Sequence, residues 1–340
     1  MKIIVDAMGG DNAPDEIVRG SLDAARDLNI EIVLAGRGED ILRVIERLGM
    51  KGLPRGIEIV NASEVVEMED DPAIAVRVKK DSSLTVALNL LRDGRGDALV
   101  SAGSTGALLS GATLIVKRVR GVRRAALAPI IPNTGSGFVL IDCGANSDCN
   151  PEYLLQFAFM GAFYAEDFLK IGNVRVGLLN NGTEKTKGTG LQLEAYKLLE
   201  TAGVDGYLNF IGNVEAKDAL NGACDVLVCD GFTGNALLKS IEGTATLIMS
   251  ELKGIYKKNL ITKLSAALIK KHIYSLRAKM NPDTIGGTAL LGISKPVIKA
   301  HGSSNAFAIK SAISQAMNSA ASDTAARLQQ VLSDLKSADE

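Results

Sequence analysis

The chain has 340 residues, enough for one large α/β domain, and its 46% apolar and 23% charged residues exclude a disordered or fibrous protein. Its 38 Lys and Arg residues nearly balance its 39 Asp and Glu residues, and a net charge of −1 gives no indication of a nucleic-acid partner. Glycine is frequent, at 35 residues, whereas aromatic residues make up only 4%. We therefore expect turns whose backbone approaches a ligand closely, without stacking of bases on aromatic rings.

Short β-branched runs alternate with longer stretches of helical period along most of the chain. The predicted strands are Ile3–Asp6, Glu31–Leu34, Ile57–Val60, Ala98–Ser101, Phe138–Ile141, Val174–Leu179, Leu208–Ile211 and Val226–Cys229. The predicted helices between them include Pro14–Leu28, Ile41–Leu48, Leu84–Leu91, Leu154–Leu169 and Leu191–Leu199. Several strands are apolar on both faces, which is typical of a mostly parallel sheet covered by helices on both sides. Because no repeat or linker-like stretch interrupts this pattern, we predict a single α/β domain over residues 1–340 with one helical appendage.

The appendage is predicted at about residues 247–280, where eight lysines and arginines accompany a single acid, Glu251. Within it, Leu260, Leu264, Ala267 and Leu268 fall on one face of a helix. A cationic amphipathic helix of this kind is a candidate for contact with an anionic membrane or an acidic partner. The alternative is a hairpin that packs in a dimer and keeps its basic face in water.

Several classes of site are not supported. The four cysteines and two histidines fit no metal-ligand spacing, and the signatures of dinucleotide, Walker A and serine-hydrolase sites are missing. We therefore expect no metal and no cofactor. A strand-like run follows Met1 directly, without a signal peptide, and no apolar run has the roughly 20 residues that span a bilayer. We expect a cytoplasmic protein with reduced cysteines.

Five predicted strands end in loops of one composition, in which small residues accompany Asn, Asp, Ser and Thr. These loops are Asp6–Asp11, Ser101–Gly106, Asp142–Asn146, Asn180–Gly188 and Asp230–Asn235. Because ligands bind at the carboxyl ends of parallel strands, we expect the loops to share one pocket at one edge of one sheet. Gly103–Gly106 opens a helix and has the form of an anion cradle for phosphate or a carboxylate. Each loop taken alone is also compatible with an ordinary turn or helix cap. His301, in a Gly- and Ser-rich turn, is compatible with either a functional or a structural role.

Six short motifs occur in order along the chain: Asp6–Asp11, Ser101–Ala107, Ile141–Asn146, Glu184–Gly188, Gly231–Asn235 and Ile298–Gly302. Together they closely resemble the bacterial phosphate acyltransferases, which convert acyl-[acyl-carrier-protein] and inorganic phosphate into acyl phosphate. The resemblance spans essentially the whole chain, and its visible departure is Ser104, where that family usually has Asn.

The resemblance implies a three-layer α/β/α sandwich related to the isocitrate and isopropylmalate dehydrogenases and to phosphotransacetylase. It also implies a homodimer, peripheral association with the inner face of the cell membrane, and work with a membrane glycerol-3-phosphate acyltransferase at the start of phospholipid synthesis.

Attack of phosphate on a thioester needs an anion cradle and oriented donors for the oxyanion, and it can proceed without a catalytic triad. On this basis we assign phosphate and substrate binding to Gly103, Ser104, Thr105, Gly106, Asn146, Asn181, Gly182, Thr183, Glu184 and Gly234. The predicted catalytic residues are Lys187, which neutralises charge and is oriented by Glu184, and Asn235 and His301, which serve as oxyanion donors or leaving-group acid. Four carboxylates are expected to order the loops: Asp6, Asp11, Asp142 and Asp230.

Because the carrier protein is acidic, we expect a basic docking surface on this chain. One candidate consists of Arg118, Arg120, Arg123 and Arg124, and the other lies in the appendage and consists of Lys257, Lys258, Leu260, Lys263 and Leu264. Which of the two meets the carrier and which meets the membrane stays open at this point.

Two other functions compete. An oxidoreductase on the related dehydrogenase fold would need an acidic metal cluster and a nicotinamide-binding signature, and neither is found in the sequence. A non-catalytic scaffold for lipid or carrier protein would have no need of the polar strand-end loops.

Overall fold

A computed structural model of the chain describes residues 1–273 and 286–338, and its strands form two sheets where the sequence predicts one. The seven-stranded sheet has the order β3-β2-β1-β4-β12-β11-β5, and the five-stranded sheet has the order β6-β7-β10-β8-β9. The strands are β1 (Lys2–Asp6), β2 (Glu31–Gly36), β3 (Ile57–Asn61), β4 (Ala98–Ser101), β5 (Ala126–Ala128), β6 (Ile130–Ile131), β7 (Phe138–Ile141), β8 (Arg175–Leu179), β9 (Asn209–Val214), β10 (Val226–Val228), β11 (Thr288–Leu291) and β12 (Val297–Lys299).

Most neighbouring strands are parallel, as predicted, and the antiparallel pairs involve β11, which pairs with β12 and β5, and β6, which pairs with β7. The strands that the sequence pattern does not predict are β5, β6, β11 and β12, which have two to four residues each. The eight strands that it predicted all form, with ends that differ by up to three residues.

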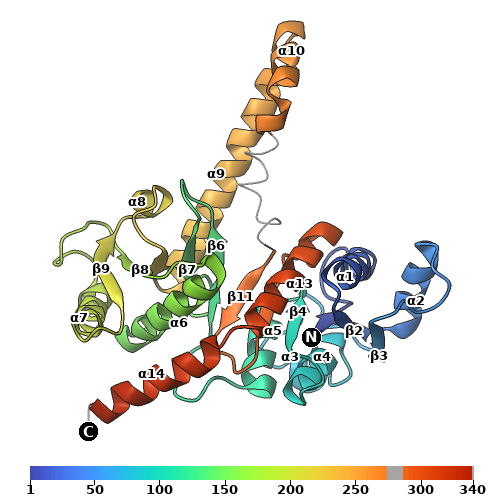
Figure 1. The fold of residues 1–340 in the computed structure, drawn as a ribbon, viewed down its shortest axis with the longest axis horizontal. Helices are drawn as coiled ribbons and strands as arrows, with labels where there is room; N and C mark the ends of the chain where they lie inside the picture. The colour runs from blue at the N-terminus through green and yellow to red at the C-terminus, as the bar shows by residue number, and fades with distance from the viewer. Residues whose placement is uncertain (274–285, 339–340) are drawn as a thin grey trace.

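Helices cover both faces of each sheet, which confirms the α/β class. They are α1 (Asp15–Leu28), α2 (Gly38–Arg47), α3 (Ala75–Val78), α4 (Ser83–Arg92), α5 (Thr105–Gly111), the π-helix η1 (Ala112–Val116), α6 (Pro151–Leu169), α7 (Gly190–Val204), α8 (Ala216–Leu220), α9 (Gly231–Lys257), α10 (Leu260–Leu268), α13 (Ala306–Ala320) and α14 (Thr324–Ala338). Figure 1 shows two lobes, one around β1–β4 and one around β7–β9, with β11 and α13 between them.

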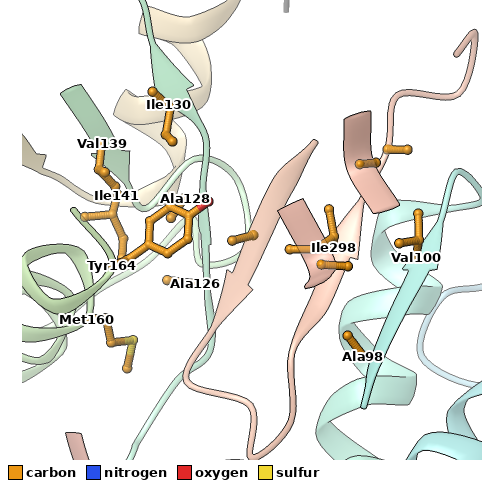
Figure 2. Packing of buried hydrophobic residues seen from close by; sticks show 14 of the residues in the cluster. Ala98, Val100, Ala126, Ala128, Ile130, Val139, Ile141, Met160, Tyr164 and Ile298 are labelled. Carbon is orange, nitrogen blue, oxygen red and sulfur yellow. The ribbon is translucent and has the colours of Figure 1, made fainter. Parts of the chain in front are cut away.

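Alternate residues of the strands belong to two buried clusters, one on each face. In β4, Ala98 and Val100 join the cluster that includes α1, α6 and α13, whereas Leu99 joins the cluster that includes α4 and α5. Both clusters contain residues of both sheets, and Figure 2 shows side chains of the first running from Val139 in β7 to Val100 in β4. This continuous packing holds the carboxyl ends of the two sets of parallel strands in a fixed relation.

The chain crosses between the sheets more than once. Pro129 alone separates β5 in the first sheet from β6 in the second. After α9 and α10 the chain returns to the first sheet as β11 and β12, and α14 then packs against α6 of the second lobe. Hydrogen bonding fixes this last contact, because the Thr324 hydroxyl donates to the Asp167 carboxylate at 2.6 Å.

The helix that carries the first part of the predicted appendage, α9, begins earlier in the sequence, at Gly231. The Asp230 carboxylate caps it by accepting a hydrogen bond from the backbone N–H of Thr233 at 2.8 Å. With α10, this helix projects away from both lobes (Figure 1). Residues 274–280 of the predicted appendage, and the side chain of Leu260, lie outside the described part of the chain.

Within residues 1–273 and 286–338, no helix combines the length and the apolar composition needed to cross a bilayer.

Candidate functional site

A cavity of about 1140 Å³ lies where the carboxyl ends of strands from the two sheets meet. From the first sheet it is lined by Thr105, after β4, and by Lys299 and His301, at and after the end of β12. From the second sheet come Gly144, after β7, and Asn235, in the first turns of α9. The expected pocket at the strand ends therefore exists, but it lies between two sheets and not along one.

The rest of the cavity presents more apolar than polar surface, although the Lys239–Glu242 pair and several Ser, Thr and Asn side chains also line it. It extends along α9 and the β5–β6 connection, where its lining includes Leu127, Pro129, Ile130, Ile131, Leu238, Ile241, Ala245 and Ile248. The cavity thus has a polar end at the strand termini and an apolar arm that follows α9. We call these two parts the polar end and the apolar arm.

Glycines allow the loops behind the polar end to pack backbone against backbone. A Cβ at Gly9 would lie 2.7 Å from the Gly103 nitrogen, and a Cβ at Gly10 would lie 2.9 Å from the Gly302 carbonyl oxygen. Gly10 also has φ of +105°, a conformation that glycine adopts without strain. The loops after β1, β4 and β12 are therefore locked together, although the first of them does not line the cavity.

Asp6 lies at the centre of this packing. Its carboxylate accepts a hydrogen bond from the Ser101 hydroxyl at 2.7 Å, and burial raises the pKa of the Asp6 carboxyl. The loop-ordering role expected for Asp6 agrees with this position, because the carboxyl group joins β1 to β4.

Lys299, which lies in the motif Ile298–Gly302 but is not among the predicted site residues, ends β12 at the cavity. Its ammonium group donates hydrogen bonds to the carbonyl oxygens of Ala102, at 3.2 Å, and Ala300. Burial lowers the pKa of Lys299 to about 8, although Asp6 and Asp11 act in the opposite direction. A charged residue that ends a buried apolar strand is the signal that could have identified it.

His301 is exposed and lines the polar end. The backbone N–H of Ser303 donates to its Nδ1 at 3.2 Å, and the Ser303 hydroxyl lies 2.9 Å from the same atom. Because Nδ1 accepts the backbone hydrogen bond, the neutral ring carries its proton on Nε2. His301 is thereby prepared to donate a hydrogen bond through Nε2.

Asp142, the buried carboxylate after β7, orders its loop. It accepts five hydrogen bonds, from the backbone N–H groups of Leu127, Cys143, Ala145 and Asn146 and from the Asn146 side chain. Burial raises the pKa of this carboxyl. The Asn146 amide also donates to the Ala125 carbonyl at 2.8 Å, so both of its N–H hydrogens are used within the protein.

The cysteine at the cavity is held as a neutral thiol. Burial, and after it the nearby charge of Asp142, raises the pKa of Cys143 to about 12. A thiol in that state is a poor nucleophile, because the thiolate is the reactive form.

Of the residues predicted to bind phosphate or substrate, Thr105 lines the cavity, and several others have roles within the protein. The Ser104 hydroxyl caps α5 by accepting from Ala107 N–H at 3.5 Å. Gly234 packs against the Asp142 carbonyl oxygen, and Gly106 packs against Pro72.

The loop Asn180–Gly188 follows β8, beside β10, and does not line the cavity. Within the loop, the Asn180 amide donates to the Lys187 carbonyl at 3.0 Å. Asn213 of β9 holds the loop from outside by donating to the Glu184 carbonyl at 2.8 Å. Lys187 and Glu184 both pack beside Gly182. The assignments of Asn181, Gly182, Thr183, Glu184 and Lys187 stay predictions.

The four arginines of the predicted docking stretch are exposed: Arg118, Arg120, Arg123 and Arg124. The backbone of Arg118 forms an isolated antiparallel β-bridge with Ile293, which lies beyond the end of β11. Thr288, at the start of the same strand, lines the cavity. The arginine stretch thus lies at the opposite end of β11 from the cavity. In the appendage, Lys257, Lys258, Lys263 and Leu264 are exposed.

Across the two described ranges, no three His, Cys, Asp or Glu side chains are grouped so that they could hold a metal ion.

Comparisons with known proteins identify the family and the fold of the chain. The family model described as "Fatty acid synthesis protein" matches residues 1–327. The phosphate acyltransferase of Oceanobacillus iheyensis is 47% identical over 93% of this chain and 92% of its own length. That of Thermoanaerobacter pseudethanolicus is 48% identical over 94% and 93%. A phosphotransacetylase from Streptococcus pyogenes shares the fold, with a TM-score of 0.62, 18% identity and 94% coverage of both chains.

The match to the family model and the identities above 40% extend over nearly the full length of the chain. The α/β fold predicted from the strand and helix pattern is also the fold of the phosphotransacetylase. The chain therefore belongs to the fatty acid synthesis protein family, within its phosphate acyltransferases, and is an acyltransferase.

Proposed function

We propose that the chain transfers a fatty acyl group from acyl-[acyl-carrier-protein] to inorganic phosphate and releases acyl phosphate for phospholipid synthesis. The observation that carries this proposal is the division of the cavity into a polar end and an apolar arm. An acyl thioester needs both kinds of surface, one for its chain and one for its reacting carbonyl. The cavity is at the upper end of the size range of small-molecule sites, which suits a long chain together with phosphate.

The proposed reaction is a direct displacement at the thioester carbonyl. A phosphate oxygen attacks the carbonyl carbon and forms the new C–O bond, and the tetrahedral oxyanion then breaks its C–S bond. The electron pair of that bond leaves with sulfur as a thiolate, which takes up the proton lost by the phosphate. A pantetheine thiolate leaves readily, because free thiols of this type have a pKa of about 8.5.

The residues at the polar end provide donors for the oxyanion. The Nε2–H of His301 and the side-chain amide of Asn235 come from the two different sheets and line the same cavity. Thr105 adds a hydroxyl on the side of the anion cradle. No covalent acyl-enzyme is proposed, because the thiol of Cys143, the cysteine that lines the cavity, is neutral.

The loop Asn180–Gly188 is proposed to approach the reacting phosphate from the third side. It follows β8, whose parallel neighbour β10 leads directly into α9 and Asn235. In this proposal Lys187 supplies positive charge and Glu184 orients it, together with Asn181, Gly182 and Thr183.

We propose that the tip of the appendage contacts an anionic membrane surface on the cytoplasmic side. Ile261, Leu264 and Leu268 in α10 are 78%, 67% and 80% exposed and lie at i, i+3 and i+7, on one face of the helix. Lys257, Lys258 and Lys263 are close to them in the sequence. A helix of this composition suits the boundary between lipid headgroups and acyl chains. The membrane acyltransferase that would use the acyl phosphate lies in the same surface.

The long helix α9 also presents apolar residues to water, among them Leu247, Ile248 and Ile255. We propose that a second copy of this chain covers part of this surface in a homodimer. The acidic carrier protein is proposed to dock on the lysines of the appendage, because α9 lines the cavity and the arginine stretch lies at the far end of β11.

The test uses the full chain, long-chain acyl-[acyl-carrier-protein] and radiolabelled phosphate. We expect labelled acyl phosphate, identified by its conversion to a hydroxamate with hydroxylamine, in equal amount to the free carrier thiol. Thiol release without any labelled product would make the chain a thioesterase and overturn the proposal. A change in nicotinamide absorbance without acyl transfer would favour the dehydrogenase alternative instead.

A further inference from the structure

We propose that Lys299 is the cation that binds the phosphate nucleophile at the polar end of the cavity. This inference rests on the function proposed above and goes beyond it by assigning a substrate contact to a residue at the end of β12. It is argued from the position of the ammonium group, from its hydrogen bonds and from the charges around it.

The position of Lys299 is set by the pairing of β12 with β4 and by the residues that follow these two strands. Lys299 pairs with Ser101 across β12 and β4, and its ammonium group reaches the Ala102 carbonyl, directly before the Gly103–Gly106 cradle. The second hydrogen bond, to its neighbour Ala300, holds the group at the cavity wall. An ammonium group has three hydrogens, so one remains for a ligand in the cavity.

The charge of Lys299 is not balanced by a carboxylate in contact with it. Among the described residues no Asp or Glu oxygen lies within 4 Å of its ammonium group. Lys239, the other lysine at the cavity, is paired with Glu242 at 2.7 Å. A half-buried ammonium group that touches only carbonyl oxygens is costly unless an anion joins it, and phosphate is an anion of suitable charge.

Several charged or titratable groups surround this ammonium group. They are Asp6 and Asp11 after β1, His301 after β12, Cys143 after β7, and the Lys239–Glu242 pair on α9. Burial raises the pKa of the Asp6 carboxyl, which is held by the Ser101 hydroxyl behind the cavity wall. The pKa of Lys299 itself, about 8, leaves the ammonium form predominant at neutral pH.

The experiment compares Lys299→Met with Lys295→Met in the full chain. Lys295 is a matched control, because it too is half-buried and donates to a backbone carbonyl, that of Leu91 at 2.7 Å, but before β12 and away from the cavity. We expect Lys299→Met to raise the KM for phosphate by about tenfold or more, as for the loss of a charge-assisted hydrogen bond, with little change in the KM for the acyl donor. Lys295→Met should leave both constants unchanged. Equilibrium dialysis with labelled phosphate gives the same comparison without turnover.

A second experiment measures how phosphate binding depends on pH. Phosphate binding to the unmodified chain should weaken as the pH rises through about 8, where Lys299 loses its proton and inorganic phosphate is already a dianion. Lys299→Arg keeps its charge, so its phosphate binding should not weaken over this range. Unchanged phosphate binding in Lys299→Met, or the same pH dependence in Lys299→Arg, would overturn the assignment. A chain that makes no acyl phosphate at all would instead refute the proposed function.

Discussion

The carboxylates around the cavity differ in what their loss should do. Asp142 accepts five hydrogen bonds in a buried loop, whereas Asp230 accepts two at the exposed start of α9. We predict that Asp142→Ala lowers the free energy of unfolding by about 3–5 kcal/mol, because it leaves several buried N–H groups without partners. Asp230→Ala should lower it by about 1 kcal/mol, as for the loss of an N-cap. Urea denaturation of both variants measures the difference. Equal losses would contradict the role of Asp142 in ordering the loop after β7.

Lys299 should also leave a signature in the pH dependence of stability. Its pKa is about 8 in the folded chain and 10.5 in the reference state, so between these values the unfolded chain holds a proton that the folded chain has lost. The free energy of unfolding contributed by this group therefore rises with pH over that window, by about 2–3 kcal/mol. Lys299→Met lacks the titrating group.

The measurement is urea denaturation of both proteins at several pH values from neutral to about 10. The stability of the unmodified chain relative to Lys299→Met should increase with pH. A constant difference would mean that the environment of Lys299 does not disfavour its charged form.

At the scale of elements, the strands that escape prediction are short, although β10, also with three residues, is predicted from the apolar run Val226–Cys229. The long periodic helices and the apolar parallel strands were identified because each repeats its pattern over several residues. Strands such as β5, with three residues, and β6, with two, carry too little pattern, and they are the strands that join the two sheets. For the same reason Lys299 was overlooked, because the three-residue strand β12 that places it was not recognised.

The exposed tip of α10 gives a prediction for membrane contact. Changing Leu264 and Leu268 to Glu should release the chain from anionic vesicles, because each leucine would otherwise bury apolar surface worth about 1.5–3 kcal/mol. High salt should weaken the remaining attraction of the lysines. Turnover with soluble carrier should fall less than vesicle binding does, because the lysines proposed to dock the carrier are unchanged.

Val204→Glu provides a control, since Val204 is 83% exposed at the end of α7, outside the appendage. Vesicle flotation measures binding. Binding that survives the double change at the tip would show that α10 is not the contact, and a dimer that dissociates on size-exclusion chromatography would favour packing as its role.

At the scale of the whole molecule, the sequence predicted the α/β class but not the division into two sheets. A hydrophobic strand pattern shows that a strand is buried and leaves open which neighbour it pairs with. The strand-end loops are expected to share one pocket, and Thr105, Gly144, Asn235 and His301 reach one cavity because the two sheets face it from opposite sides. The loop Asn180–Gly188 has the same composition and does not line it.

The prediction of a single domain concerns how the chain unfolds. Because both buried clusters contain residues of both sheets, we expect one cooperative unfolding transition for the two lobes. Differential scanning calorimetry measures this, and two separate transitions would mean that the lobes are independent domains.

The central claim is that phosphate attacks the thioester directly at the cavity between the sheets. A single-turnover experiment with enzyme in excess over acyl-[acyl-carrier-protein] tests it most directly. We predict that no carrier thiol is released until phosphate is added, and that acyl phosphate then forms at the rate at which thiol is released. Release of one equivalent of thiol before phosphate is added, with the acyl group retained on the protein, would contradict the claim.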